Sequence, residues 1–427
     1  MINANIIKEE LENDRWDNRL LEIYRDFGMI KYEKERYIKA VNTFEYFFKK
    51  SEIEIYSAPG RTEVCGNHTD HQNGQVLAAA INRDIIAVVA QNNGFVRIKS
   101  GDNELIEIEL KDIHEISYKE GTSLALVVGM IIEFQNNGYD VKGFDAYIDS
   151  DVPEGAGLSS SAAFEVLVGT VISGMYNDMR VCPINMAFIA RKVENDYFGK
   201  PCGLMDQLAC SVGDFIHINF LNDKSPQISK IGFELEREGY CICVVDTGAS
   251  HSDLTEEYTA IREEMTAVAH CVGKSRLSDI TLDVIMSNTE NIRNSCGDRA
   301  FLRSVHYVRE NDRVKRAVDA IEKDDMREYL KIIKESGESS YKYLQNLYSP
   351  NDFMHQSLPI AVVLSEYLLG EDEISRVHGG GFAGTIQSYV KKENVKLYSE
   401  YMNGYFGKEA CKILSIRKYG GIKVFTD

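Results

Sequence analysis

Residues 153–163 read PEGAGLSSSAA and run directly into an apolar stretch that ends near residue 172. That stretch predicts a buried helix over residues 162–172. Glycines let a backbone approach a ligand closely, hydroxyls and amides supply hydrogen-bond donors, and a helix N-terminus carries partial positive charge. The segment therefore predicts a loop that cradles a phosphate group, with a plain Gly- and Ser-rich helix cap as the alternative. It is neither a Walker A loop, because no Gly-Lys-Ser/Thr follows, nor a dinucleotide fingerprint, because the third glycine is missing.

A second polar cluster lies upstream, where residues 58–74 read APGRTEVCGNHTDHQNG. Alternation of Ile with Glu over residues 52–55 predicts a strand that ends at the turn signal of residues 58–60. The Ile- and Val-rich residues 81–90 predict another strand, so residues 61–80 should lie between the two. Buried polar groups need partners, so a polar ligand such as a sugar fits this cluster. A solvated loop is the alternative.

A third cluster, at residues 376–384, reads RVHGGGFAG. Its glycines are typical of a flexible turn, or of a loop that presents backbone donors to a ligand. His68 and His71 in the second cluster are spaced like metal ligands. However, no further His/Cys pair in the chain supports a zinc site.

The composition is that of an acidic globular protein. Its 427 residues predict two or three domains, and 48 basic against 66 acidic residues give a net charge of −18, which argues against nucleic acid as a partner. Residues 1–20 are polar and acidic, and the longest apolar run, residues 124–132, is too short to span a membrane. Nine cysteines without a CxxC pair indicate reduced thiols. We expect a cytoplasmic protein that binds neither nucleic acid nor a membrane, with a monomer favoured.

Hydrophobic periodicity organises the remaining chain. Apolar residues at three- and four-residue steps predict helix within residues 1–50, and Pro183 fits the first turn of a helix that continues to residue 193. In the latter half, strands alternate with long amphipathic helices such as residues 313–334. The strands are predicted at residues 240–245, 386–390, 413–416 and 422–425.

Together the three clusters resemble the three motifs of the GHMP small-molecule kinases, and within them the galactokinase branch. That branch carries Gly-Arg followed by Gly-Glu-His-Thr-Asp, then Gly-Leu-Ser-Ser-Ser-Ala, then Gly-Gly-Gly-Phe-Gly-Gly. The matching positions here are residues 60–61 and 66–70, residues 157–162, and residues 379–384. Residues 194–207 also resemble the catalytic segment of the family. The similarity extends from about residue 45 to the C-terminus.

The resemblance implies an α+β fold of two domains with the active site in the cleft between them. We expect a helical extension over residues 1–45. An N-terminal domain over residues 46–210, with the ribosomal-S5-domain-2-like fold, would hold the phosphate loop. A ferredoxin-like C-terminal domain would cover residues 211–427.

The resemblance also implies an activity, the transfer of the γ-phosphoryl group of MgATP to the anomeric hydroxyl of galactose. Asp206 would be the catalytic carboxylate, and Arg61 would keep it ionised and offset the charge of the γ-phosphate. Ser161 and Glu194 match the positions that hold Mg²⁺, although which serine of the loop binds the metal stays open. The predicted ATP-binding residues are Gly155, Gly157, Leu158, Ser159, Ser160 and Ser161. The predicted sugar-binding residues are Asn67, His68, Asp70, Gly203 and Tyr258.

One departure from the family concerns the sugar. Asn67 stands where galactokinases carry a glutamate near C6, and an amide can donate to a uronate that a carboxylate would repel. We therefore predict a galactose 1-kinase, with a galacturonate 1-kinase as the alternative. A non-catalytic galactose sensor is a further alternative, which the intact Ser161-Ala162 pair disfavours. A mevalonate or homoserine kinase is another, which residues 66–70 disfavour.

Overall fold

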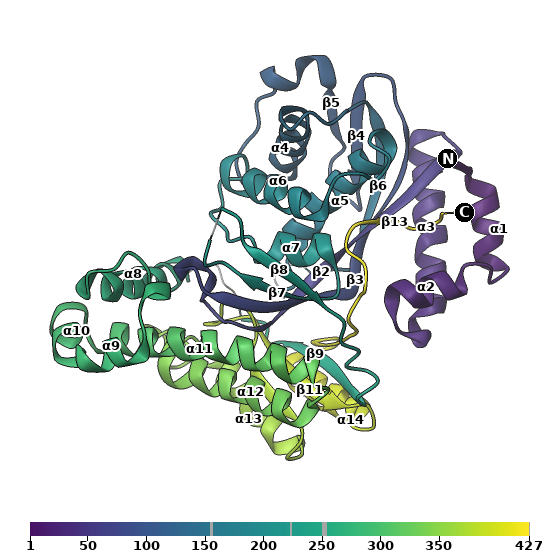
Figure 1. Cartoon of the computed structure of the whole chain (residues 1–427). Helices are drawn as coiled ribbons and strands as arrows, with labels where there is room; N and C mark the ends of the chain where they lie inside the picture. Colours follow the sequence, from purple (N-terminus) through teal and green to yellow (C-terminus); the bar gives the residue numbers. More distant parts are fainter. Residues whose placement is uncertain (154–156, 223, 250–253, 427) are drawn as a thin grey trace.

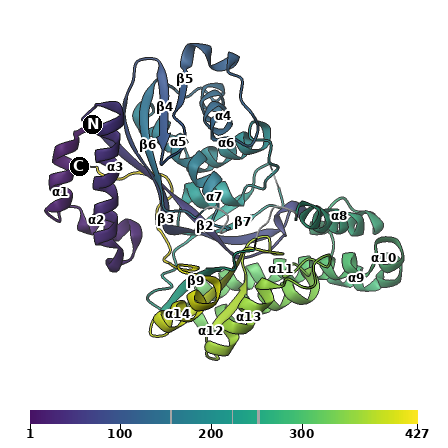
Figure 2. The same ribbon diagram turned by 180° about the vertical axis from the view of Figure 1, so that it is seen from behind.

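The computed structural model describes residues 1–153, 157–222, 224–249 and 254–426. In these ranges the strands form two sheets, one of nine strands and one of four, and helices cover both sheets (Figure 1). The two chain ends lie close together beside the larger sheet, as the view from behind also shows (Figure 2). The predicted α+β class is confirmed.

The larger sheet has the strand order β1-β2-β3-β6-β4-β5, with β13 beside β2, β7 beside β3, and β8 beside β7. Its strands are β1 (Ile2–Asn3), β2 (Glu52–Cys65), β3 (Gln75–Gln91), β4 (Phe95–Ser100), β5 (Ile106–Glu109), β6 (Phe144–Ser150), β7 (Phe215–Asn219), β8 (Gln227–Ile231) and β13 (Ile422–Lys423). The smaller sheet is antiparallel, in the order β10-β11-β9-β12. Its strands are β9 (Tyr240–Asp246), β10 (Ile374–Val377), β11 (Thr385–Lys391) and β12 (Cys411–Leu414).

Helices fill most of the remaining chain. The first half contains α1 (Ala4–Glu12), α2 (Asp17–Tyr24), α3 (Ile30–Phe48), α4 (Ser123–Asn136), α5 (Ser160–Tyr176), α6 (Pro183–Asp196) and α7 (Met205–Val212). The second half contains α8 (Thr255–Cys271), α9 (Leu282–Ser287), α10 (Thr289–Cys296), α11 (Asp298–Glu322), α12 (Met326–Ser339), α13 (Ser357–Leu368) and α14 (Val395–Phe406). The predicted helices after residues 161 and 182 correspond to α5 and α6. No helix in the described ranges is long and apolar enough to cross a membrane.

The larger sheet is covered on both faces. Along β3, Ile85, Ala87 and Val89 pack into the core that contains α4, α5 and α6, whereas Ile86 and Val88 pack against α1, α2 and α3. Successive side chains of a strand point to opposite faces, so a strand covered on both sides is apolar at every position. This double cover explains why residues 85–90 of the predicted strand are apolar without interruption.

The turn predicted at residues 58–60 is wrong. Strand β2 continues through these residues, and only its pairing with β3 shifts register between Pro59 and Arg61. Residues 66–74 therefore make the connection between the two strands, and the rest of the predicted 61–80 segment belongs to the strands. Proline and glycine can mark a bulge within a strand as well as its end, and local sequence does not distinguish the two.

The helix predicted over residues 313–334 is also wrong, because it is the end of α11 and the start of α12. Asp324 between them has a left-handed backbone, with φ +53°. Asp325 then caps α12 by accepting the backbone N–H of Glu328 at 3.0 Å. A side-chain cap of this kind favours a new helix start over continuation.

The larger sheet includes strands from both sides of the predicted domain boundary near residue 211. Strands β7 and β8 follow that boundary, yet β7 pairs with β3 and β8 pairs with β7. Strand β13, near the C-terminus, pairs with β2. The predicted domain ranges therefore do not coincide with the two sheets, and the division of the chain into domains stays a prediction.

Candidate active site

Arg61 and Asp206 form a bidentate ion pair at the centre of the predicted site. Arg61 lies on β2, and Asp206 lies in the first turn of α7. Nε of Arg61 donates to Oδ1 of Asp206 and Nη2 donates to Oδ2, both at 2.7 Å. Two parallel charge-assisted hydrogen bonds fix the orientation of a carboxylate as well as its distance. The structure therefore brings the two predicted catalytic residues together.

The surroundings of Asp206 favour its ionised form. Burial alone raises the pKa of this carboxyl group. The charge and hydrogen bonds of Arg61 and the hydrogen bond from Ser159 outweigh burial, so the pKa of Asp206 lies below its ordinary value. A carboxylate in this state can orient a hydroxyl group and accept its proton.

The phosphate loop is attached directly to this ion pair. Nη1 of Arg61 donates to the carbonyl oxygen of Gly157, and the Ser159 hydroxyl donates to Asp206. Gly157 and Ser159 have left-handed backbones, with φ of +66° and +58°. Only a glycine adopts this conformation without cost, so Gly157 is needed for the shape of the loop.

The loop leads into the N-terminus of α5. Ser160 is the first residue of this helix, and Ser161 follows in its first turn. The first N–H groups of a helix have no partner within it, which suits them to bind phosphate oxygens. Leu158 is fully buried and anchors the loop. Gly155, which the sequence also assigns to ATP, lies outside the described residues.

Ser161 and Glu194 lie side by side. The Ser161 hydroxyl donates to Oε1 of Glu194 at 2.9 Å. On the other side, Nε2 of Gln207 donates to Oε2 of Glu194 at 2.6 Å, and it also lies 3.3 Å from Oε2 of Glu165. Glu165 is fully buried, and burial together with the charge of Glu194 raises its pKa well above the ordinary value. Gln207 thus supports Glu194 directly, and Glu165 contacts Gln207.

Sequence reasoning missed these two supporting residues for different reasons. Gln207 follows Asp206 directly in the chain and could have been included as its neighbour. Glu165 stands among apolar residues of a predicted buried helix. A buried carboxyl group needs a hydrogen-bonding partner, so Glu165 could have been predicted to lie beside a polar residue.

The Asn67 side chain is buried and hydrogen-bonded to other residues of the protein. It is fully buried, and Nδ2 donates to Oε1 of Glu63 at 2.9 Å and to the carbonyl oxygen of Gly379 at 2.6 Å. Oδ1 accepts a hydrogen bond from Asn346 at 2.8 Å. Both amide hydrogens of Asn67 are therefore used. The side chain links the second cluster to the third, and its contact with a sugar stays a prediction.

His68 and Tyr258 lie against the glycines of the third cluster. Nε2 of His68 lies 2.9 Å from the carbonyl oxygen of Gly380, and the Tyr258 hydroxyl donates to the carbonyl oxygen of Gly381 at 2.9 Å. Their rings stack, with centroids 6.4 Å apart and planes inclined by 24°. The two predicted sugar-binding residues, far apart in sequence, thus form one surface.

Asp70 and Gly203 also meet. A Cβ atom at position 203 would overlap Oδ2 of Asp70, so a larger residue there would displace the Asp70 carboxyl group. Burial and the nearby charge of Asp206 raise the pKa of Asp70, against the opposing effect of His68. Gly203 comes shortly before α7, so Asp70 contacts the segment that leads to Asp206.

The third cluster packs against the second cluster and the phosphate loop. Nε2 of His378 lies 3.0 Å from the Thr62 hydroxyl, and a Cβ atom at Gly157 would lie 3.4 Å from Nδ1 of His378. Arg376 is almost fully buried and donates to the carbonyl oxygen of Val64. The three clusters of the sequence therefore meet where the two sheets adjoin.

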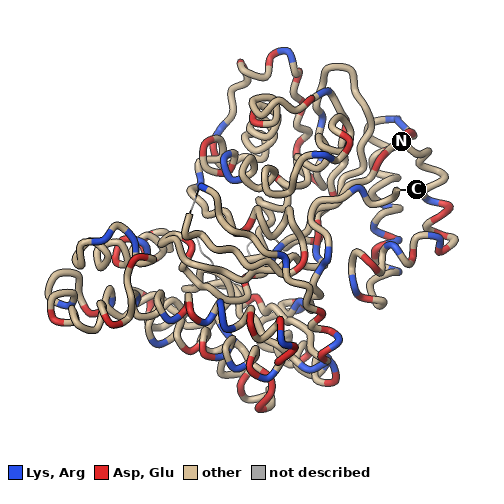
Figure 3. The backbone as a smooth tube through the Cα atoms, viewed as in Figure 1, with Lys and Arg blue, Asp and Glu red and all other residues tan. Residues whose placement is uncertain are grey.

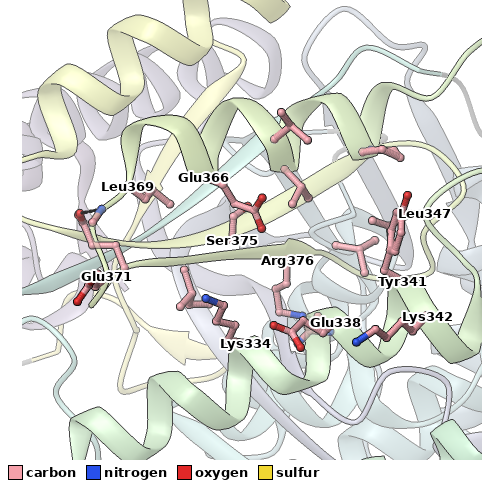
Figure 4. Close-up of a pocket in the computed structure, with 18 residues that line it drawn as sticks. Lys334, Glu338, Tyr341, Lys342, Leu347, Glu366, Leu369, Glu371, Ser375 and Arg376 are labelled. Carbon is pink, nitrogen blue, oxygen red and sulfur yellow. Dashed lines mark hydrogen bonds between the residues drawn. The ribbon is translucent and has the colours of Figure 1, made fainter.

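A separate cavity of about 620 Å³ lies between α12, α13 and β10 (Figure 4). Its lining includes apolar side chains such as Val362 and Leu369 and charged side chains such as Lys334 and Glu366. None of the described residues that we predicted for the site lines this cavity. The candidate site is therefore defined by the chemistry of its side chains and not by cavity size.

Comparison with known proteins agrees with this geometry. A family model described as the GHMP kinases N terminal domain matches residues 125–214, which include the phosphate loop and Asp206. The fold and the site thus define a GHMP kinase, a class that uses ATP. A second model, the galactokinase galactose-binding signature, matches residues 42–91.

Relatives specify the branch of this class. The chain is 30% identical to a galactokinase of Thermotoga petrophila over 86% of this chain and 94% of the relative. It is 29% identical to a galactokinase of Streptomyces coelicolor over 84% of this chain and 90% of the relative. The chain therefore belongs to the galactokinase family.

Solved structures share the fold. The galactokinase of Lactococcus lactis, determined in complex with galactose, matches with a TM-score of 0.76 and 22% identity, over 90% of this chain and 98% of that chain. The mevalonate kinase of Methanococcus jannaschii matches with a TM-score of 0.62 and 15% identity, over 86% and 98%. The predicted GHMP kinase fold is confirmed.

Proposed function

We propose that the protein transfers the γ-phosphoryl group of ATP to the anomeric hydroxyl of galactose, giving galactose 1-phosphate and ADP. The bond between the γ-phosphorus and the bridging oxygen breaks, and a bond between that phosphorus and the anomeric oxygen forms. The hydroxyl proton leaves through Asp206. The Arg61–Asp206 pair, held against the phosphate loop by Gly157 and Ser159, is the observation that carries this proposal.

Arg61 and Asp206 have different roles in this proposal. Phosphoryl transfer requires mainly positioning and stabilisation of charge on the phosphoryl oxygens. Arg61 orients the Asp206 carboxylate, and its positive charge lies beside the loop that would hold the phosphates. Because the pKa of Asp206 is low, the carboxylate is a weak base. It would orient the sugar hydroxyl first and take the proton as the new bond forms.

Two groups of residues bind the substrates in this proposal. The sugar lies against His68, Asp70, Gly203 and Tyr258, which supply hydrogen-bonding groups and an aromatic face. The ATP phosphates bind the loop of residues 155–161 and the N-terminus of α5.

The residues at the loop also fit a Mg²⁺ ion. Ser161 and Glu194 present a hydroxyl and a carboxylate, which are hard oxygen donors, 2.9 Å apart. Within the described ranges, no group of three or more His, Cys, Asp or Glu residues is arranged to hold a metal ion. A hydroxyl and a carboxylate suit Mg²⁺, which keeps several waters and binds through few protein ligands together with phosphates. When bound, the ion would neutralise phosphate charge.

The proposal is tested by comparing phosphoryl acceptors. ADP release is measured with galactose, galacturonate, N-acetylgalactosamine and glucose, and phosphorus NMR locates the new phosphate. We expect galactose to be the best acceptor, with the phosphate on the anomeric oxygen. A higher kcat/KM for galacturonate would replace galactose as the substrate. Galactose binding without any ADP release would indicate a sensor.

Asp206→Asn is the matched variant, because it keeps the shape of the side chain and removes its charge. We expect kcat to fall by about 100-fold or more, since a positioned proton acceptor contributes factors of about 10² to 10⁴. Calorimetry should still detect galactose binding. A variant with the kcat of the wild type would remove Asp206 from the proposed role.

A further inference from the structure

Lys200 is a cation at the candidate site that none of the three sequence clusters includes. Its Nζ lies 3.0 Å from Oε1 of Glu194. The lysine side chain is 60% exposed, whereas that of Glu194 is 2% exposed. The ammonium group thus contacts a buried carboxylate from the solvent side.

The backbone fixes the position of Lys200. Its N–H donates to the carbonyl oxygen of Glu194 at 3.0 Å, and Gly199 before it has a left-handed backbone with φ +80°. The N–H of Cys202 donates to Oδ1 of Asn195 at 2.7 Å. These contacts fold the segment after α6 back over the last turn of that helix. The lysine head group is therefore held near Glu194.

The same carboxylate oxygen connects Lys200 to the phosphate loop. Oε1 of Glu194 accepts hydrogen bonds from both Lys200 and Ser161, and Ser161 lies in the first turn of α5. The helix N-terminus and the ammonium group thus lie on either side of one oxygen atom. A phosphate chain bound at the N-terminus of α5 would come within reach of Nζ of Lys200.

Lys200 also has unused hydrogen-bonding capacity. Three nitrogens of Arg61 are occupied, two by Asp206 and one by the carbonyl of Gly157. Lys200 makes one described side-chain hydrogen bond, and an ammonium group carries three hydrogens. Arg61 has two further N–H hydrogens, and Lys200 adds a second cation with donors available for a ligand in the described part of the site.

The overall charge of the protein makes such a donor useful. The net charge is −18, and acidic residues are interspersed with basic ones along the whole chain (Figure 3). ATP carries several negative charges, so its binding requires a local positive potential. We propose that Lys200 binds the phosphate oxygens of ATP, exchanging its contact with Glu194 for them when the nucleotide enters. This inference rests on the proposed function and names a residue that recognises the nucleotide.

Calorimetric binding of the magnesium complex of a non-hydrolysable ATP analogue, in which nitrogen bridges the β- and γ-phosphates, tests this role. Lys200→Met should weaken binding by about 10- to 100-fold, the usual effect of losing a hydrogen bond with a charged partner. Lys200→Arg, which keeps the charge, should restore most of the affinity. Galactose affinity, measured in the same way, should change less than twofold in both variants.

Lys192→Met is the matched control. Lys192 lies on α6, the helix that carries Glu194, and makes the same kind of contact as Lys200. Its Nζ lies 2.8 Å from Oε2 of Glu133, a 51% exposed lysine on a 4% exposed glutamate. If only the stability of the helix mattered, both methionine variants would weaken nucleotide binding alike. We expect Lys192→Met to bind the analogue within twofold of the wild type.

Three results would overturn the inference: analogue binding by Lys200→Met within twofold of the wild type, equal weakening in Lys192→Met, or no rescue by arginine. Failure of the proposed function has a different signature. A wild-type protein that phosphorylates none of the sugars, yet binds the analogue in a way that depends on Lys200, would refute the activity and support the role of Lys200.

Discussion

The amide of Asn67 joins its cluster to Gly379 of the third cluster, 312 residues later in the chain. Its donors bind Glu63 and the backbone of Gly379, and its acceptor binds Asn346. The glutamate of the galactokinase pattern would place a second carboxylate beside Glu63 and would leave the Gly379 carbonyl without this donor. The departure from the family at position 67 therefore has an explanation in packing that does not involve the sugar.

We expect Asn67→Glu to lower the free energy of unfolding by about 2–4 kcal/mol, because it buries a charge next to a like charge. Urea denaturation followed by circular dichroism measures this change. Asn103→Glu, at an exposed position, is the control and should shift stability by less than about 0.5 kcal/mol. A variant as stable as the wild type, with an altered preference between galactose and galacturonate, would show that residue 67 reaches the sugar.

At the scale of elements, a buried charge cluster binds helix α3 to the larger sheet. Arg36 donates to Oδ1 of Asp84 at 2.6 Å and to Oδ2 of Asp149 at 2.8 Å, and Arg417 donates to Oδ2 of Asp84 at 2.8 Å. Burial raises the pKa of Asp84, but the two arginines outweigh it and lower the pKa. The N-terminal helices are thus part of the core and not a loose extension.

Arg36→Met should lower the free energy of unfolding by about 3–5 kcal/mol, because removing one partner leaves buried carboxylates incompletely neutralised. Thermal and urea denaturation measure the loss. Lys31→Met, on the same helix, removes an exposed pair in which Nζ lies 4.0 Å from Glu35, and it should cost less than about 1 kcal/mol. Equal effects of the two substitutions would show that the buried cluster adds nothing specific.

Sequence patterns predicted elements better than their connections. Runs of consecutive apolar residues identified α5 and β3, because both elements are buried along most of their length. The bulge at Pro59 and the break at Asp324 were missed, since each depends on local backbone geometry that a turn signal or a helical period does not specify. The partners of Arg36 were missed as well, because Asp84 and Asp149 are distant in the chain.

At the scale of the whole molecule, strands near both chain ends pair with the same strand, β2. Ile2 of β1 pairs with Ile53 of β2, and Ile422 of β13 pairs with Ser57 of β2. The candidate site shows the same long-range assembly. Its loops could be predicted because their motifs are local, whereas the supporting contacts of Glu165 and Asn67 depend on which segments meet. The residues of a site can be predicted from their resemblance to known motifs. The contacts that hold those residues depend on tertiary packing.

Because both chain ends pair with β2, we expect the N-terminal helices and the C-terminal segment to unfold together. Phe425 is 2% exposed and packs on Trp16 and Tyr37, with ring centroids 4.8 and 5.4 Å away. Phe425→Ala should lower the free energy of unfolding by about 3–5 kcal/mol. Leu397→Ala, at a 60% exposed position, is the control, with an expected loss below about 0.5 kcal/mol.

The single tryptophan makes this prediction measurable, because Trp16 fluorescence reports on the terminal helices while circular dichroism reports on the whole chain. We expect the two signals to give the same urea midpoint in the wild type, and Phe425→Ala to shift both midpoints together. A fluorescence transition at lower urea than the circular dichroism transition would mean that the terminal helices separate first. The contacts of Arg36 and Phe425 would then be too weak to join them to the rest of the core.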